Sequence, residues 1–305
     1  DEKSSRITRF SSTEYGDILN QALTLYNSGE YEKALPLWKQ VIARDNYSKL
    51  AYTGTGKALL QQGNYKEALE HFRLGEDRES YSEAFEEYRF QYMRENFTVI
   101  ATGVLLVMIL LLAVRKLKKD RKEAAKKTSH WAMLKAPVTT LQDLLYKKQL
   151  SAMVATIIVV SWFGLEIVKF FGTGFIFNQN SPADFNIFLP LMSTIILYVL
   201  FVVVNWAVST LTDGKGTLRT IYCSTSYVLL PYLLTQAAVL VLSHVFVLEE
   251  QAFLTFILLT GYVWSGILLL IVLTTVHDYT IGKACGNLFL TLFGMLILVF
   301  LLFIA

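Results

Sequence analysis

The sequence predicts an all-α fold: a polytopic helical membrane protein with a soluble domain of helical repeats at its N-terminal end. Three observations predict it. Of the 305 residues, 53% are hydrophobic and only 17% are charged, whereas soluble domains carry about 25% charged residues. Six long apolar runs follow residue 96. The segment before them repeats at an interval of 34 residues.

Charge divides the chain into three kinds of segment. Residues 1–97 carry 13 Lys/Arg and 16 Asp/Glu, residues 115–148 carry 11 and 3, and residues 149–305 carry 4 and 6. Because the basic excess is confined to one short block between apolar runs, membrane topology explains it before nucleic-acid binding does. Two cysteines in the apolar half provide no disulfide framework, and we expect no metal and no other cofactor.

Residues 1–96 are expected to form the soluble domain. The string Gly29 to Leu35 (GEYEKAL) matches Gly63 to Leu69 (GNYKEAL) at an offset of 34, and Trp38 matches Phe72 at the same offset. This pattern resembles the tetratricopeptide repeat, a helix hairpin in which small residues and aromatics interlock. Two copies need a further helix to complete their core, which we place over 82–96. Its aromatic residues are expected to pack: Phe85, Tyr88, Phe90 and Tyr92.

The resemblance implies a concave surface that binds a peptide or a protein. Outward positions on the first helix of each copy would form it, namely Tyr26, Asn27, Thr53, Lys57 and Gln61. The string Gly54 to Lys57 (GTGK) looks like part of a phosphate-binding loop, but it does not follow a strand and the repeat places it inside a helix. No nucleotide site is expected there.

Residues 97–114 form an uncharged run of 18, long enough as a helix to cross a hydrocarbon layer of roughly 30 Å. Five more spans are expected over residues 152–175, 187–211, 221–248, 252–276 and 284–305. Basic loops alternate with loops that have no Lys or Arg, and basic loops stay on the cytosolic side. We therefore expect residues 1–96 and Ala305 to lie outside the cytosol of a bacterial cytoplasmic membrane. An export signal, removed upstream of Asp1, is then expected.

Residues 115–150 are expected to form a cytosolic connector. Eight of the thirteen residues 115–127 are Lys or Arg, which fixes the topology and, alternatively, attracts anionic lipid. Apolar residues at helical spacing over 139–150 predict an amphipathic helix in the cytosolic interface. A docking surface for a cytosolic partner is the alternative. The residues expected at this lipid or partner interface are Trp131, Leu141, Leu145, Lys147 and Lys148.

Glu166 and Lys169 lie three residues apart, on one face of the second span. An unpaired charge in mid-membrane costs about 2.5–3.5 kcal/mol, so the two side chains are expected to pair or to face the bundle. A structural pair is favoured over an ion or proton path. The predicted hydrogen-bond partners between helices are Asn205, His244 and Asn287, and His277 is expected to anchor the interface.

The membrane half carries a second resemblance, over about residues 130–305. Asp213 to Leu218 (DGKGTL) leads into Ser226 to Tyr232 (SYVLLPY), and Val276 to Tyr279 (VHDY) precedes Gly282 to Ala284. The order and spacing of these strings are similar to those of the Yip1 membrane domain in its bacterial form. The resemblance implies a five-helix bundle over 151–305 without known catalytic residues. Eukaryotic relatives are associated with vesicle traffic and small GTPases, whereas bacterial members with an added repeat domain are often encoded beside carbohydrate ABC importers.

These features favour a noncatalytic accessory or scaffold subunit of a membrane transport complex over an enzyme. The complex implied is a bacterial carbohydrate ABC importer. Expected partners are its permease subunits, an extracytoplasmic substrate-binding protein held by the repeat domain, and membrane lipids, but no nucleic acid. One alternative is a stand-alone channel or carrier that uses Glu166 and Lys169, although the sequence shows neither an evident inverted repeat nor a Gly/Pro-broken helix pair. Another is a lipid or trafficking organiser that acts through the basic connector.

Overall fold

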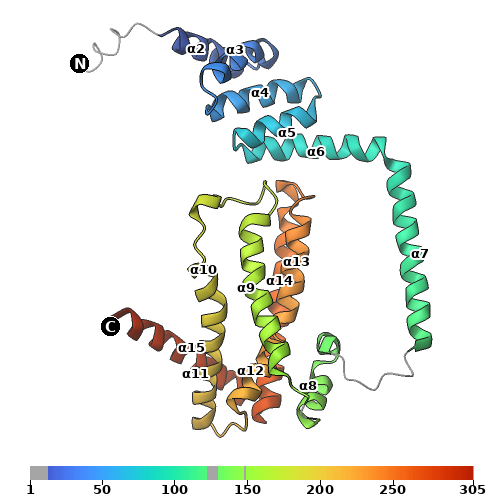
Figure 1. Ribbon diagram of the computed structural model, residues 1–305, viewed down its shortest axis with the longest axis vertical. Helices are drawn as coiled ribbons and strands as arrows, with labels where there is room; N and C mark the ends of the chain where they lie inside the picture. The colour runs from blue at the N-terminus through green and yellow to red at the C-terminus, as the bar shows by residue number, and fades with distance from the viewer. Residues whose placement is uncertain (1–12, 122–129, 148, 305) are drawn as a thin grey trace. The chain divides into compact units, whose positions relative to one another are not determined.

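The computed structural model describes residues 13–121, 130–147 and 149–304 (Figure 1). All regular secondary structure in these ranges is helical, which confirms the predicted fold class. Six helical segments are long and apolar enough to span a membrane. The chain divides into two compact units, residues 1–122 with 247–249 and the remaining residues. Each unit is described by itself.

The first unit begins with five helices that pack in chain order, each against the next (Figure 1). They are α2 (Glu14–Asn27), α3 (Tyr31–Arg44), α4 (Lys49–Gln61), α5 (Tyr65–Leu74) and α6 (Arg78–Glu95). Gly29 and Gly63 form the turns of two helix hairpins with φ of +77° and +74°. Glycine adopts this conformation without steric cost, and the two turns repeat at the predicted interval.

The core of the repeats interlocks glycines with aromatic rings. Trp38 and Phe72 are fully buried. A Cβ atom on Gly54 would lie 2.3 Å from the Trp38 ring, and one on Gly56 would lie 2.6 Å from the Phe72 ring. Helix α4 therefore approaches both rings only because these positions have no side chain. Both glycines lie within α4, so the string GTGK is helical as expected and forms no phosphate loop.

The further helix predicted over 82–96 is α6, which starts at Arg78, earlier than predicted. Ala84 is buried, and Phe85 and Tyr88 pack against the core of the second hairpin. Phe90 and Tyr92 are 46% and 51% exposed, so the expectation that they pack in this core is wrong. The physical reason is length: α6 has 18 residues and its neighbour α5 has 10.

Helix α7 (Phe97–Arg121) follows and contains the first span, Phe97–Val114. Every residue of this span is exposed. Since a run of 18 uncharged and mostly apolar residues is unstable in water, lipid or packed protein must cover it.

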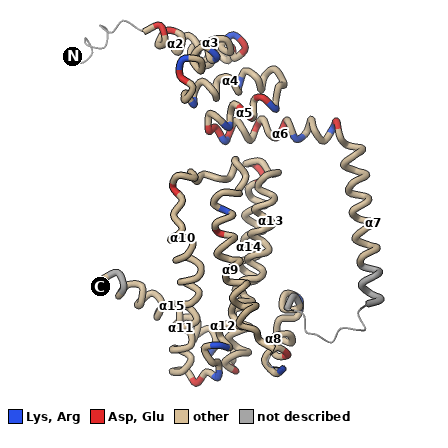
Figure 2. The backbone as a smooth tube through the Cα atoms, viewed as in Figure 1, with Lys and Arg blue, Asp and Glu red and all other residues tan. Residues whose placement is uncertain are grey.

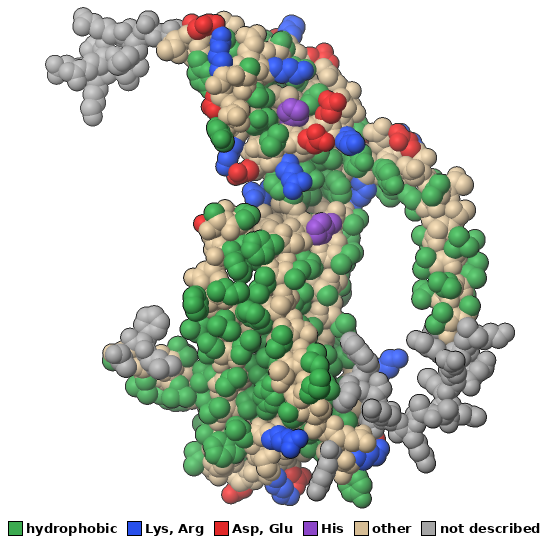
Figure 3. Space-filling model, viewed as in Figure 1, with side chains coloured by type: hydrophobic (Ala, Val, Ile, Leu, Met, Phe, Trp, Pro, Cys, Tyr) green, Lys and Arg blue, Asp and Glu red, His purple; other side chains and the backbone are tan. Residues whose placement is uncertain are grey.

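The second unit contains five membrane spans (Figure 1). They are formed by α9 (Ala152–Gly172); α10 (Phe188–Leu191), η3 (Met192–Ile196) and α11 (Leu197–Leu211); α12 (Leu218–Ser226) and α13 (Leu229–Leu242); α14 (Gln251–His277); and α15 (Ile281–Ile304). Hydrophobic side chains cover much of the side of the bundle seen in Figure 3. Figure 2 shows charged residues at its two ends, and Glu166 and Lys169 lie inside α9. This distribution is typical of a helical bundle in lipid.

Two of these spans are interrupted near a proline. Segment η3 is a π-helix two residues after Pro190, and a two-residue turn separates α12 from α13 just before Pro231. Proline lacks the N–H that a continuous helix requires, and at the second break Leu230 N–H donates to Tyr227 O at 3.2 Å instead. Residues 188–211 remain helical throughout, so only the second of these two spans contains a break, and the expectation of no broken pair is not contradicted.

The short helix α8 (Pro137–Tyr146) packs on the bundle, in contact with α14. Leu141 and Leu144 are fully buried in the bundle core, and Leu145 packs against that core. The expectation that Leu141 contacts lipid or a partner is wrong, because α14 covers the apolar face of the helix. Lys147 Nζ lies 3.5 Å from Asp143. The side chain of Trp131 and all of Lys148 lie outside the described residues.

Candidate functional site

Helices α2 and α4 carry the five residues predicted to bind a partner. Asn27 and Gln61 are exposed, while Tyr26 and Thr53 are half-buried. The Tyr26 ring packs edge-on against Tyr31 and Trp38, at centroid distances of 5.1 and 6.2 Å, and burial raises the pKa of its hydroxyl. Their role in binding stays a prediction.

Lys57, the fifth residue, is linked to α6, the second helix after its own. Its ammonium lies 2.9 Å from Glu83 of α6 and 5.9 Å from the centroid of the Phe72 ring. Glu83 is a residue that sequence reasoning missed, because the pairing of α4 with α6 depends on how the hairpins stack. The two side chains place a positive and a negative charge side by side on the repeat domain.

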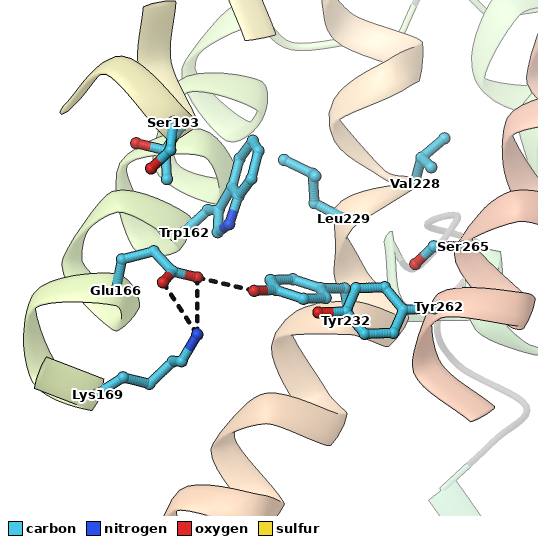
Figure 4. Close-up of a pocket in the computed structure, with 10 residues that line it drawn as sticks. Trp162, Glu166, Lys169, Ser193, Val228, Leu229, Tyr232, Tyr262 and Ser265 are labelled. Atoms are coloured by element: carbon cyan, nitrogen blue, oxygen red, sulfur yellow. Dashed lines mark hydrogen bonds and ion pairs between the residues drawn. The ribbon is translucent and has the colours of Figure 1, made fainter. Parts of the chain in front are cut away.

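The other predicted pair lies in a pocket within the bundle (Figure 4). Lys169 Nζ lies 2.9 Å from Glu166 Oε2 and 3.2 Å from Oε1, both on α9. Tyr232 of α13 donates its hydroxyl to Glu166 Oε1 at 2.7 Å. Gln236 in turn donates to the Tyr232 hydroxyl at 3.2 Å. The pair is therefore tied to a second span, and Tyr232 was not predicted.

The pocket has a volume of about 410 Å³. Both interrupted spans contribute to its wall: Ser193 and Thr194 come from η3, and Val228 and Leu229 from the break between α12 and α13. Rings of Trp162, Tyr232 and Tyr262 line the remainder, with Tyr232 at 6.2 Å from Trp162 and 5.4 Å from Tyr262. Helix breaks and π-helical turns occur frequently at functional sites.

A buried polar network lies at the C-terminal end of α14, around His277. His277 is 1% exposed. Gly216 N–H donates to His277 Nδ1 at 3.3 Å, so the proton resides on Nε2, which donates to Asn205 Oδ1 at 3.1 Å. Asn205 Nδ2 donates to Asn287 Oδ1 at 2.8 Å and to Thr291 Oγ1 at 3.0 Å. Asn205 and Asn287 therefore form hydrogen bonds between helices, as expected of each.

The same network corrects the expectation that His277 anchors the interface. The imidazole points into the bundle and stacks on Tyr279 at 5.1 Å. His244, by contrast, lies near the Leu240 carbonyl of its own helix at 3.0 Å and forms no described bond between helices. Asp278, the residue after His277, faces outward. Lys215 binds its carboxylate and holds the pKa of that group below its usual value.

Two of the strings that carry the Yip1 resemblance, DGKGTL and VHDY, meet at this network. A Cβ on Gly214 would lie 2.5 Å from the Tyr279 hydroxyl, and one on Gly216 would lie 2.7 Å from His277 Cε1. DGKGTL and VHDY are thus two halves of one contact, in which glycines let the loop backbone approach the imidazole. Within the described residues, no three His, Cys, Asp or Glu side chains are grouped to hold a metal.

Comparison with known families identifies both parts of the chain. The family model for the Yip1 domain matches residues 131–304. The chain belongs to the Yip1 domain family. A tetratricopeptide-repeat model matches residues 19–83, so the resemblances to the tetratricopeptide repeat and to the Yip1 domain are confirmed. Neither curated proteins nor solved structures give a significant match.

The Yip1 domain thus includes both the pocket and the His277 network, and the tetratricopeptide repeats include the Lys57 surface. The protein is a multi-pass membrane protein with a protein-interaction module. Neither family is enzymatic, which agrees with the predicted noncatalytic role.

Proposed function

We propose that this Yip1-domain protein is a noncatalytic accessory subunit of a membrane transport complex, and that the complex is a bacterial carbohydrate ABC importer. In this proposal the repeat domain lies outside the cytosol and recruits an extracytoplasmic partner such as a substrate-binding protein. The bundle packs against the permease in the cytoplasmic membrane. One observation supports the proposal above others: a tetratricopeptide-repeat module is joined by a membrane span to a bundle of a noncatalytic family.

Tethering explains how such a subunit works without chemistry. A partner held by a short link experiences an effective concentration in the millimolar range. Weak contacts by the repeat surface are then occupied most of the time. A transport complex with a tethered partner therefore captures substrate faster than one that relies on free diffusion.

Copurification tests this proposal. The full chain with a tag after Ala305, extracted in mild detergent, is expected to recover permease and ATPase subunits. Recovery of the chain alone, under conditions that keep other membrane complexes intact, contradicts it.

A charge placed on the repeat surface tests the role of that surface. Gln61→Lys, at an exposed position of α4, is expected to reduce recovery of the extracytoplasmic partner at least about fivefold, which corresponds to roughly 1 kcal/mol. Gln40→Lys, at an exposed position of α3, is the matched control because it makes the same change on a second helix of the repeat. Equal recovery by both variants argues against binding at this surface, and far-UV circular dichroism checks that both remain folded.

A stand-alone carrier is the second candidate, and one observation favours it. One span with a π-helical segment and one broken span line the pocket that holds Glu166 and Lys169, and carriers often bind substrates beside broken helices. Reconstituted protein that moves a solute, with flux abolished by Glu166→Gln, supports this candidate over the accessory subunit. The organiser that acts through residues 115–127 gains no such support, because those side chains lie outside the described residues.

A further inference from the structure

We propose that the pocket around Glu166 and Lys169 is a binding site for one phospholipid with a zwitterionic, amine-bearing headgroup, of the phosphatidylethanolamine type. Its ammonium binds Glu166, its phosphate binds Lys169, and an acyl chain enters the adjoining apolar cavity. This inference goes beyond the accessory role and does not depend on which complex the protein joins.

The charges of the pocket call for a ligand that carries both signs. The side chains of Glu166 and Lys169 remain 22% and 30% exposed although they pair with each other. A carboxylate has about four acceptor positions and an ammonium has three donors, so the pair retains capacity for a further donor and a further acceptor. An anionic headgroup meets repulsion from Glu166 and a cationic one from Lys169, whereas a zwitterion complements both.

One further donor lacks a partner at this site. Ser265 Oγ lines the pocket and is buried without a hydrogen bond to any described residue. A buried donor without a partner costs about 1–3 kcal/mol. The phosphate and ester oxygens of a phospholipid accept a hydrogen bond from such a donor, whereas an alkane or a detergent tail has no acceptor.

The apolar end of the site is a second cavity of about 340 Å³, which shares Trp162, Val228 and Leu229 with the first. Hydrophobic side chains dominate the rest of its wall, including Phe201, Leu269 and Met295. A pocket that holds a charge pair and shares part of its wall with an apolar cavity matches an amphiphile, with its head at the charge pair and its chain beyond Trp162. Each cavity has the size of a small-ligand site.

The depth of these residues agrees with a lipid standing upright in one leaflet. Lys169 is three residues before the end of α9 and Trp162 is ten residues before it. At 1.5 Å per residue these positions lie about 5 Å and about 15 Å from the helix end. The charge pair is then near the headgroup level, and Trp162 is near the middle of a layer roughly 30 Å thick.

Native mass spectrometry of the delipidated full-length protein tests the proposal by titration with defined lipids. The lipids are palmitoyl-oleoyl phosphatidylethanolamine, the anionic phosphatidylglycerol with the same chains, and phosphatidylcholine, whose quaternary ammonium donates no hydrogen bond. We expect one phosphatidylethanolamine to bind at least about tenfold more tightly than phosphatidylglycerol, since a charge-assisted hydrogen bond is worth about that factor. Phosphatidylcholine is expected to bind between the two.

Variants assign this preference to the pocket. Glu166→Gln is expected to make the affinities for phosphatidylethanolamine and phosphatidylglycerol equal. Ser193→Phe fills the pocket from η3 without altering the charge pair, and is expected to reduce binding of all three lipids at least about fivefold. Met192→Phe adds a ring at the adjacent exposed position, which does not line the pocket, and is the matched control.

Three results overturn the proposal. They are equal or tighter binding of phosphatidylglycerol by the unaltered protein, unchanged lipid binding in Ser193→Phe, and equal losses in Ser193→Phe and Met192→Phe. Because the readout is lipid affinity, failure here leaves the accessory role intact, and failure of copurification leaves the lipid site intact.

Discussion

Individual polar residues in the bundle are satisfied by partners far away in the chain. Asn205 and His277 are 72 residues apart, and Asn205 and Asn287 are 82 apart. In hydrocarbon a polar side chain without a partner is unfavourable. The network therefore stabilises one arrangement of α11, α14 and α15, the three helices that contribute these side chains.

Asn205→Leu tests this stabilisation. The substitution removes the acceptor of His277 Nε2–H and the donor to Asn287 Oδ1, and we expect it to lower the free energy of unfolding by about 1–3 kcal/mol. Thr210→Leu is the control on the same helix, because Thr210 is exposed and bonds only to its own helix. Thermal unfolding in detergent measures both. An equal midpoint for Asn205→Leu and the unaltered protein contradicts a stabilising network.

At the scale of elements, the amphipathic pattern of α8 does not tell whether lipid or protein covers its apolar face. Its apolar face suits lipid and a protein surface equally well, since both exclude water. Helix α14 covers this face, so α8 belongs to the bundle core. The interrupted spans show the complementary effect: a π-helical segment follows Pro190, a break precedes Pro231, and the bundle places both around one pocket.

Substitutions on α8 test whether its apolar face packs on the bundle or lies in lipid. Leu144→Ala removes a fully buried side chain and is expected to cost about 2–5 kcal/mol of stability. Tyr146→Ala, at a position 89% exposed, is expected to change little. The measurement is the unfolding midpoint of each variant in detergent. If α8 lies in the lipid interface instead, neither variant shifts the midpoint.

At the scale of the whole molecule, the proposed function depends on the side of the membrane that each end of the chain occupies. Basic residues are sparse in the membrane half and alternate between loops, so the orientation depends chiefly on the block over 115–127. The recruitment of an extracytoplasmic partner requires residues 1–96 to be translocated.

Cysteine labelling of intact cells tests this orientation. In a background with Cys223→Ala and Cys285→Ala, Ser28→Cys on the repeat domain is expected to react with an impermeant maleimide added outside. Asp213→Cys, in an exposed loop of the bundle, is expected to react only after permeabilisation, because Lys and Arg hold its loop in the cytosol. The reverse pattern excludes recruitment of an extracytoplasmic partner.

The sequence by itself determined the properties that depend on local pattern. The length of apolar runs predicted six spans, and the interval of 34 residues predicted the repeats, since both are set by residues close together in the chain. It also placed Glu166 and Lys169 on one helix face. Only the tertiary structure decided that Tyr232 holds this pair, that His277 is buried and that Leu141 faces α14. These contacts join residues distant in sequence, and the packing of helices that creates them leaves no periodic signal to read.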